Sequence, residues 1–182
     1  MFHSNTQRLI DHWRGLQTGR GAPDHRQFDP VELAPILSHL FMLDRSAGLP
    51  FRLAGALVED LHGRSLKGQS FLGLWAAESR AAAREAVVGS EHGAEPVVLY
   101  TEAATASDQR AGLEITLAPL ADDRGRTVKF LGLCQPVTTL VRLHGETLLA
   151  YRHKLTLFAG EEETTARAPR LRLAAVDGRR IA

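Results

Sequence analysis

The residue types that most often carry chemistry occur in this chain, but few of them are grouped. Cys134 is the single cysteine, and it lies in the apolar stretch of residues 131–135. A thiol that reacts with a flavin needs a polar setting, whereas a free thiol on an apolar strand packs as a small hydrophobic group. We therefore expect Cys134 to be buried and inert. Gln135 beside it faces either a cofactor or solvent, and noncovalent flavin binding stays an unsupported alternative.

Two histidines stand directly before glycines, His62 before Gly63 and His92 before Gly93. An imidazole that faces a cavity can be an axial ligand of haem. An exposed position at the C-terminal end of a helix is the favoured interpretation for both histidines, since a cation there complements the helix dipole. The other histidines are scattered without the short spacing of metal ligands, so no metal site is predicted.

Ser70 lies in Gly-Gln-Ser-Phe-Leu-Gly, which has one residue too many for a nucleophile elbow. The serine is better explained as a helix cap. Residues 63–68 contain Lys67 but lack the Gly-Lys-Ser/Thr ending of a phosphate-binding loop. No catalytic residue is predicted, and the chain is not expected to be an enzyme.

Length and composition are those of one globular domain. The chain has 182 residues, 44% hydrophobic residues and a formal net charge of +1, so no general field attracts nucleic acid or anionic membranes. The start is polar, and no stretch approaches the ~20 apolar residues of a membrane helix. These features predict a cytoplasmic protein. The last residues, 160–182, carry three glutamates and then five arginines, which predicts a mobile tail.

An amphipathic helix is predicted over residues 5–18. Leu9, Trp13 and Leu16 recur at helical spacing and form one apolar stripe. Two uses of this stripe stay open. It can form the interface of a homodimer, or it can pack on the chain's own sheet, as amphipathic helices usually do.

The elements that follow alternate between short helices and strands. Asp29 and Pro30 predict the start of a second helix, which Pro35 keeps short. Further helices are predicted over 57–62 and 76–88, and strands over 40–43, 51–54, 97–102, 113–117 and 128–134. We expect a flanking helix and loop at 1–28, a compact core at 29–136, and a C-terminal extension at 137–159. In that extension the spacing of Leu148, Arg152 and Leu155 fits a helix, whereas Leu149, Tyr151, His153 and Leu155 fit the alternation of a strand. A helix or long hairpin that docks on the core is predicted.

The residue pattern of the first half of the chain resembles that of a family of small bacterial PAS-like proteins. The matching features are Trp13, Asp29-Pro30, Leu40-Phe41-Met42-Leu43-Asp44, Phe51-Arg52-Leu53-Ala54-Gly55 and Leu61-His62-Gly63-Arg64-Ser65-Leu66-Lys67-Gly68. The resemblance covers about residues 5–136, with the second half matching by pattern only. It implies an α+β fold with a five-stranded antiparallel sheet and short helices on one face. It also implies a sensory or protein-interaction module in bacterial signalling. Many members have no assigned ligand, so the resemblance carries over no binding residues and leaves the cofactor unknown.

A sheet and helices arranged in this way form a cup that can hold a small apolar ligand. The residues expected to line the cup are Phe51, Leu53, Gly55, Leu57, Phe71 and Trp75. Gly55 in an apolar strand indicates either a bend or the close approach of another group. The alternative is that the chain's own side chains fill the cup.

Three functions remain open at this point. The chain binds a small ligand or a signalling protein as a sensory module, or it is a ligand-free interaction scaffold. The third is an enzyme of another cup-shaped α+β fold, which would need titratable groups converging in a cleft.

Overall fold

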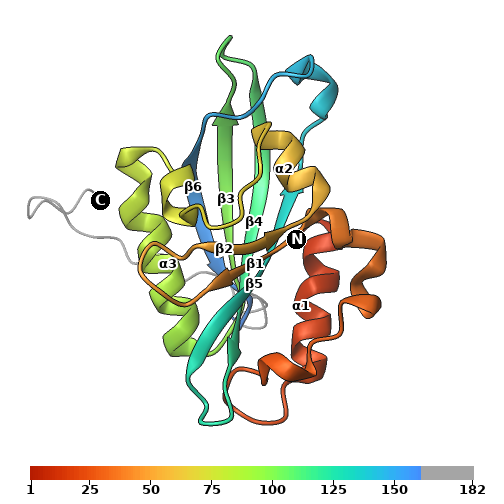
Figure 1. The fold of residues 1–182 in the computed structure, drawn as a ribbon, viewed down its shortest axis with the longest axis vertical. Coiled ribbons are helices and arrows are strands. Elements are labelled where there is room, and N and C mark those ends of the chain that lie inside the picture. The colour runs from red at the N-terminus through yellow and green to blue at the C-terminus, as the bar shows by residue number, and fades with distance from the viewer. Residues whose placement is uncertain (161–182) are drawn as a thin grey trace, which may run out of the picture.

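The computed structural model describes residues 1–160, which form an antiparallel sheet with helices packed on both faces (Figure 1). Across the sheet, the described strands follow the order β2-β1-β5-β4-β3-β6. They are β1 (Leu40–Asp44), β2 (Phe51–Ala54), β3 (Val97–Ala104), β4 (Arg110–Ala121), β5 (Thr127–Pro136) and β6 (Ala150–Phe158). The predicted α+β class and its five strands are confirmed, and a sixth strand extends the sheet.

The α-helices are α1 (Ser4–Leu16), α2 (Ala56–His62) and α3 (Arg80–Gly93). Short 3-10 helices lie between them and after the last long strand pair: η1 (His25–Gln27), η2 (Pro30–His39), η3 (Phe71–Leu74), η4 (Ala77–Ser79) and η5 (Leu140–Leu143). Two predicted helix starts are confirmed. The Asp29 side chain accepts a hydrogen bond from the Val31 amide at 2.9 Å, and Ser70 Oγ accepts one from the Gly73 amide at 3.2 Å.

The alternation of side chains along the strands divides the core between two faces of the sheet. On β5, Phe130 and Cys134 belong to the core of the inner face, which α2, η3 and α3 cover. Leu131 and Leu133 belong to the core of the outer face, which α1 and η2 cover. Figure 1 shows α1 and α3 on opposite sides of the molecule.

The C-terminal extension is a strand, so the prediction of a helix or long hairpin over 137–159 is wrong. After η5, residues 150–158 form β6, which pairs antiparallel with β3 from Val97↔Phe158 to Ala104↔Ala150. Without β6, β3 would be an edge strand with unpaired amides and carbonyls. This pairing with a strand far back in the chain outweighs the helical spacing of Leu148, Arg152 and Leu155. The sheet therefore continues past Pro136, and the predicted tail lies outside the described residues from 161 onward.

Candidate functional site: the inner face of the sheet

A cluster of packed rings occupies the inner face of the sheet. The rings belong to Phe41, Phe51, Phe71, Trp75, Tyr151 and His62. The centroids of Phe41 and Phe51 lie 5.4 Å apart, and those of Phe71 and Trp75 lie 5.8 Å apart. These distances are typical of favourable aromatic pairs. Each of the six residues is at most 8% exposed, so the chain's own side chains occupy the cup.

Two glycines in this part of the fold lie close to other groups of the chain. Gly132 on β5 lies opposite Phe41 on β1, and a Cβ at this position would collide with the Phe41 ring. The missing side chain therefore lets the ring lie against the strand. Gly55 lies against the backbone carbonyls of Leu37 and Ser38 in η2. Of the two explanations for Gly55, the close approach of another group is the one observed.

The polar atoms of the cluster have few partners. Trp75 Nε1 is buried and has no hydrogen-bond partner, while Tyr151 Oη lies 4.0 Å from Cys134 Sγ. Burial raises the pKa of the Cys134 thiol to about 12, and burial raises the pKa of Tyr151 well above its ordinary value. Both groups are therefore neutral at physiological pH. Cys134 is buried, as predicted, and a thiol of this pKa is a poor nucleophile.

His62 lies at the rim of the cluster, in the last turn of α2. Its Nδ1 donates a hydrogen bond to the Val58 carbonyl at 2.8 Å, and its ring meets Tyr151 edge to face at 5.5 Å. Desolvation by burial lowers the pKa of His62, which keeps the imidazole neutral. The expected exposed position at a helix end is therefore wrong for His62, which is 8% exposed. His92 does occupy an exposed position at a helix end, where its Nδ1 is bonded to the Val88 carbonyl.

The predicted cup residues divide into two groups. Phe51, Phe71 and Trp75 are brought together in the ring cluster, and Leu57 packs against its edge, partly buried. Leu53 pairs with Met42, whose side chain faces the outer core, and it is 50% exposed. A bulge between Met42 and Leu43 in the pairing with β2 changes the alternation, and the sequence carries no clear signal of it.

Besides His62, two ring residues of the cluster, Phe41 and Tyr151, were not among the residues predicted to line the cup. Phe41 lay in an expected strand whose facing was not assigned. Tyr151 lay in the ambiguous extension, where its alternation with His153 was the available signal.

The apolar stripe of the first helix faces the chain's own sheet. Leu9 and Trp13 are at most 2% exposed in the outer core, and Trp13 Nε1 donates to the Pro119 carbonyl at 2.7 Å. Leu16 is partly buried. Of the two uses left open, packing on the chain's own sheet is the one observed. A homodimer formed through this stripe would require α1 to leave the sheet.

A polar layer lies between the first turn of α1 and the outer face of the sheet. Both carboxylate oxygens of Glu114 accept from the His3 amide, at 3.2 and 3.1 Å. Asn5 Nδ2 donates to Gln135 Oε1 at 2.8 Å. Glu114 and Gln135 are directly opposite on β4 and β5, and they are 3% and 5% exposed. Gln135 therefore faces α1, neither the cup nor solvent.

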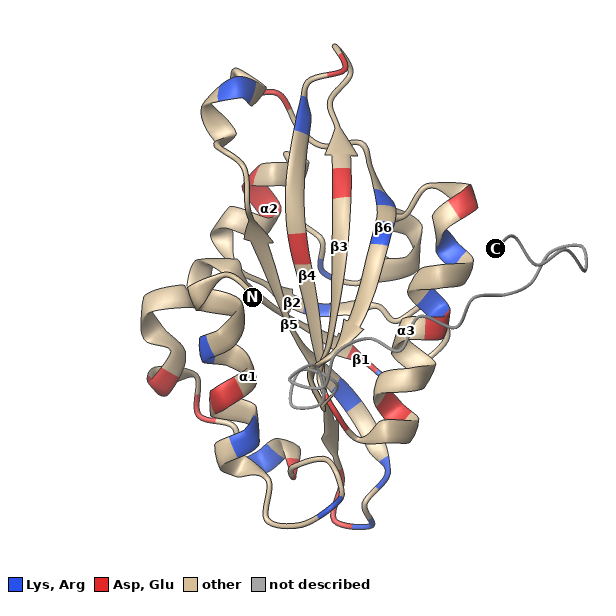
Figure 2. Ribbon diagram, turned by 180° about the vertical axis from the view of Figure 1, so that it is seen from behind, with Lys and Arg blue, Asp and Glu red and all other residues tan. Residues whose placement is uncertain are grey.

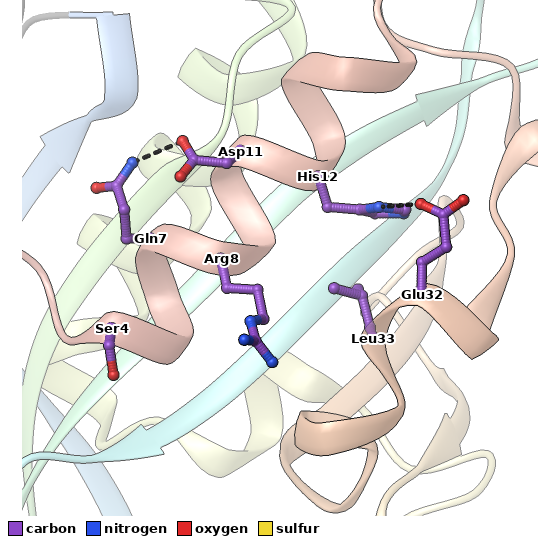
Figure 3. A pocket seen from close by; sticks show the side chains of 7 residues that line it. All are labelled: Ser4, Gln7, Arg8, Asp11, His12, Glu32 and Leu33. Carbon is purple, nitrogen blue, oxygen red and sulfur yellow. Dashed lines mark hydrogen bonds and ion pairs between the residues drawn. The ribbon is translucent and has the colours of Figure 1, made fainter.

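A surface groove runs between α1 and η2 (Figure 3). His12 Nδ1 lies 3.1 Å from Glu32 Oε2, and Gln7 Nε2 donates to Asp11 at 2.8 Å. The Arg8 guanidinium points into the groove (Figure 3). The groove thus contains one arginine, Arg8, and two carboxylates, Asp11 and Glu32, that already have partners. This set is not a recognisable catalytic or ligand-binding arrangement.

Charges and metal-ligating residues are dispersed over the described part of the chain. Along the ribbon of residues 1–160, positions of Lys and Arg are interspersed with positions of Asp and Glu (Figure 2). Among residues 1–160, no group of three or more His, Cys, Asp or Glu side chains could hold a metal ion. No helix in this part is long and apolar enough to cross a membrane.

Comparisons with known proteins agree with this architecture. The PAS domain family matches residues 1–135. The chain therefore belongs to the PAS domain family, whose members are generally sensory and signalling modules. A comparison with curated proteins gave no match.

Several solved structures of light-oxygen-voltage (LOV) domains are similar in fold. A LOV domain studied with a flavin analogue is 18% identical with a TM-score of 0.49, and the alignment covers 62% of this chain and 86% of that one. The aureochrome 1 LOV domain in its dark state is 15% identical with a TM-score of 0.49, covering 64% and 88%. A LOV protein of Rhodobacter sphaeroides is 16% identical with a TM-score of 0.48, covering 64% and 72%. At these identities the similarity does not extend to what those proteins bind.

Proposed function

We propose that this chain is a regulatory PAS module that signals through contacts with a partner protein and holds no chromophore in its cup. The filled inner face carries this proposal. A haem or flavin needs a cavity of several hundred Å³. The same space here is occupied by six packed rings, which would have to rearrange to admit a cofactor.

The outer face supports a role in protein contacts. It is covered by α1, and the exposed apolar residues Leu37 and Leu53 lie on η2 and β2. Burial of exposed apolar side chains is a common source of affinity between proteins. The partner is proposed to be a signalling protein, and a second copy of this chain is the alternative occupant.

A small ligand is the second candidate, and one observation favours it. Trp75 Nε1 is buried without a partner, and an unpaired buried donor is costly. A small molecule with a hydrogen-bond acceptor would satisfy this donor if the surrounding rings moved apart. Such a ligand would be small, because the ring cluster leaves little room for it.

The setting of the module follows the family resemblance. A bacterial, cytoplasmic signalling pathway and the absence of enzymatic activity are part of the proposal. The absence of activity is supported by His62 and Cys134. Burial raises the pKa of the Cys134 thiol to about 12, which makes it a poor nucleophile. His62 is buried against the ring cluster with Nδ1 bonded to the Val58 carbonyl, away from the surface where a substrate would bind.

Native mass spectrometry of the purified full-length protein, with an absorption spectrum of the same sample, tests the proposal. The expected result is the mass of the bare chain and no band at roughly 400–450 nm, where haem and flavin absorb. A bound mass together with such a band would overturn the protein-contact function. A bound mass without a chromophore would favour the small-ligand candidate.

A further inference from the structure

The loop between α2 and η3, residues 63–70, is fixed by contacts with the rest of the chain. Leu66 is 0% exposed and belongs to the inner core. Glu59 Oε1 on α2 accepts a hydrogen bond from the Leu66 amide at 3.0 Å and one from Ser65 Oγ at 2.8 Å. The hydrogen bonds from Leu66 and then Ser65 lower the pKa of the Glu59 carboxyl, which favours its charged form. The middle of the loop is therefore anchored on α2.

The end of the same loop is anchored on the edge of β2. The Gly68 amide donates to the Phe51 carbonyl at 2.7 Å, and the Phe51 amide donates to the Gln69 carbonyl at 2.9 Å. Gly68 has a φ of +77°, a conformation that glycine adopts most easily, and the chain turns there. The part of the edge that this loop covers thus ends at Phe51.

Beyond Phe51, the edge of β2 carries backbone groups without partners. Ala54 is paired with Phe41, and the Gly55 amide that follows donates to the Leu40 carbonyl at 2.7 Å. Successive residues of an antiparallel ladder direct their backbone groups to opposite sides, so the amide and carbonyl of Ala54 point away from β1. Neither group is hydrogen-bonded to another residue of the described chain. An extended segment beside β2 would supply partners for both.

A surface hollow of about 580 Å³ lies over β2 beside this loop. Its lining residues are Asp44, Pro50, Phe51, Arg52, Leu53, Lys67 and Gly68. Leu53 is 50% exposed, so the hollow offers an apolar side chain as well as charged ones.

Positive charge predominates in the hollow. Arg52 lies 3.8 Å from Asp44, and 58% of the Arg52 side chain is exposed. Lys67 is exposed and makes no ion pair with any of the residues 1–160. Two cations therefore face one carboxylate. A further carboxylate placed beside Lys67 would gain a partner without displacing one.

We propose that the hollow over β2 binds a short extended segment of a partner protein that carries an acidic residue next to an apolar one. The carboxylate would lie on Lys67 and Arg52, and the apolar side chain on Leu53. The backbone of the segment would pair with Ala54. Because Glu59 already holds the loop in place, binding requires little further ordering of this chain.

A second copy of this chain is a poorer occupant of the same hollow. Pairing of two copies through β2 would bring Arg52 and Lys67 of one copy close to the same cations of the other, and like charges repel. The inference rests on the proposed function and deepens it, because it identifies the contact surface and the chemistry of the partner segment.

Selection of a random peptide library displayed on phage against the full-length protein tests this surface. We expect the enriched peptides to share an Asp or Glu close to an apolar residue. One enriched peptide, synthesised with a fluorescent label, is then titrated with the protein and followed by fluorescence polarisation. Its affinity should fall several-fold when the salt concentration is raised, because salt screens exposed charges.

Two variants and two matched controls locate the bound peptide. Lys67→Glu should weaken binding by a factor of about 10, and Leu53→Ser by a factor of about 5 to 10. Both side chains are exposed, so both variants should keep the thermal stability of the wild type. Arg84→Glu reverses an exposed charge on α3, and Leu155→Ser removes a leucine on β6 that is 49% exposed. Neither control should change the affinity.

Three results would overturn the proposal: no enriched peptide, enriched peptides without an acidic residue, or equal affinity of the wild type, Lys67→Glu and Leu53→Ser. A dimer of the wild type that Leu53→Ser dissociates would also overturn it and assign the surface to a second copy. The bare mass expected from native mass spectrometry does not depend on this hollow. Failure of the inference is therefore distinct from failure of the proposed function.

Discussion

Trp75 and Tyr151 are joined both through their backbones and through their rings. The two residues form a parallel bridge, and the Ala76 amide donates to the Tyr151 carbonyl at 2.9 Å. Their ring centroids lie 5.5 Å apart with an interplanar angle of 75°. The segment after η3 thus pairs with the open edge of β6 while Trp75 and Tyr151 fill the cup together. The sixth strand is therefore part of the inner core.

The first prediction concerns Tyr151. Tyr151→Ala should lower the free energy of unfolding by about 3–5 kcal/mol, because it removes a large buried ring and leaves a cavity. Tyr151→Phe should change it by less than about 1 kcal/mol, because the hydroxyl contacts only Cys134 Sγ at 4.0 Å. Urea unfolding of both variants measures the difference. A large loss in Tyr151→Phe would show that the hydroxyl has a polar partner in the cup.

Gly132 gives a second prediction. Gly132→Ala should destabilise the protein by about 1–3 kcal/mol, because the new Cβ would force the Phe41 ring out of place. Gly19→Ala is the control, since no atom lies within 4 Å of a Cβ at that position. Thermal unfolding of the two variants checks the comparison. Equal stability of Gly132→Ala and the wild type would mean that the Phe41 ring does not lie against β5.

The position of Phe41 illustrates what the sequence could and could not predict. A compact apolar run predicted the strand at 40–43, and a turn signal preceded the predicted strand at 128–134. The caps Asp29 and Ser70 were local signals as well, so these elements were predictable. The contact between Phe41 and Gly132 depends on the register between two strands that are far apart in sequence, and no local pattern encodes this register. The bulge that turns Leu53 outward and the pairing of β6 with β3 are non-local for the same reason.

A third prediction concerns pH and His62. Burial lowers its pKa below the ordinary 6.5, so as the pH falls through 6.5 the unfolded chain binds a proton before the folded chain does. The free energy of unfolding should then decrease with falling pH, by at most about 1.4 kcal/mol per pH unit for this group. His62→Gln should reduce this decrease between roughly pH 6.5 and the pH at which the folded protein takes up the proton.

The comparison needs a second histidine variant as its control. The pKa of His39 is also lowered, by burial and then by the nearby charge of His3. His39→Gln should therefore remove only its own share of the pH dependence. The free energy of unfolding is measured by denaturant titration at several pH values. If it changes with pH equally in His62→Gln and in the wild type, His62 is not buried in its neutral form.

A fourth prediction concerns the thiol. Cys134 is fully buried and its pKa is raised to about 12 by desolvation, so it should react with a thiol reagent only when the domain opens. The labelling rate in native buffer should then follow the unfolding rate measured independently. Rapid labelling of the folded protein would show an accessible path into the cup beside Tyr151.

Binding of indole to the full-length protein and to its Trp75→Ala variant, measured by titration calorimetry, tests the filled cup most directly. Trp75→Ala removes a side chain of the same shape as indole, and a cavity of this kind can bind the deleted group. We predict saturable binding to the variant, with an increase in its thermal stability, and no saturable binding to the wild type. Saturable binding of indole to the wild type, with no further gain in the variant, would contradict the account and show that the cup is open to ligands.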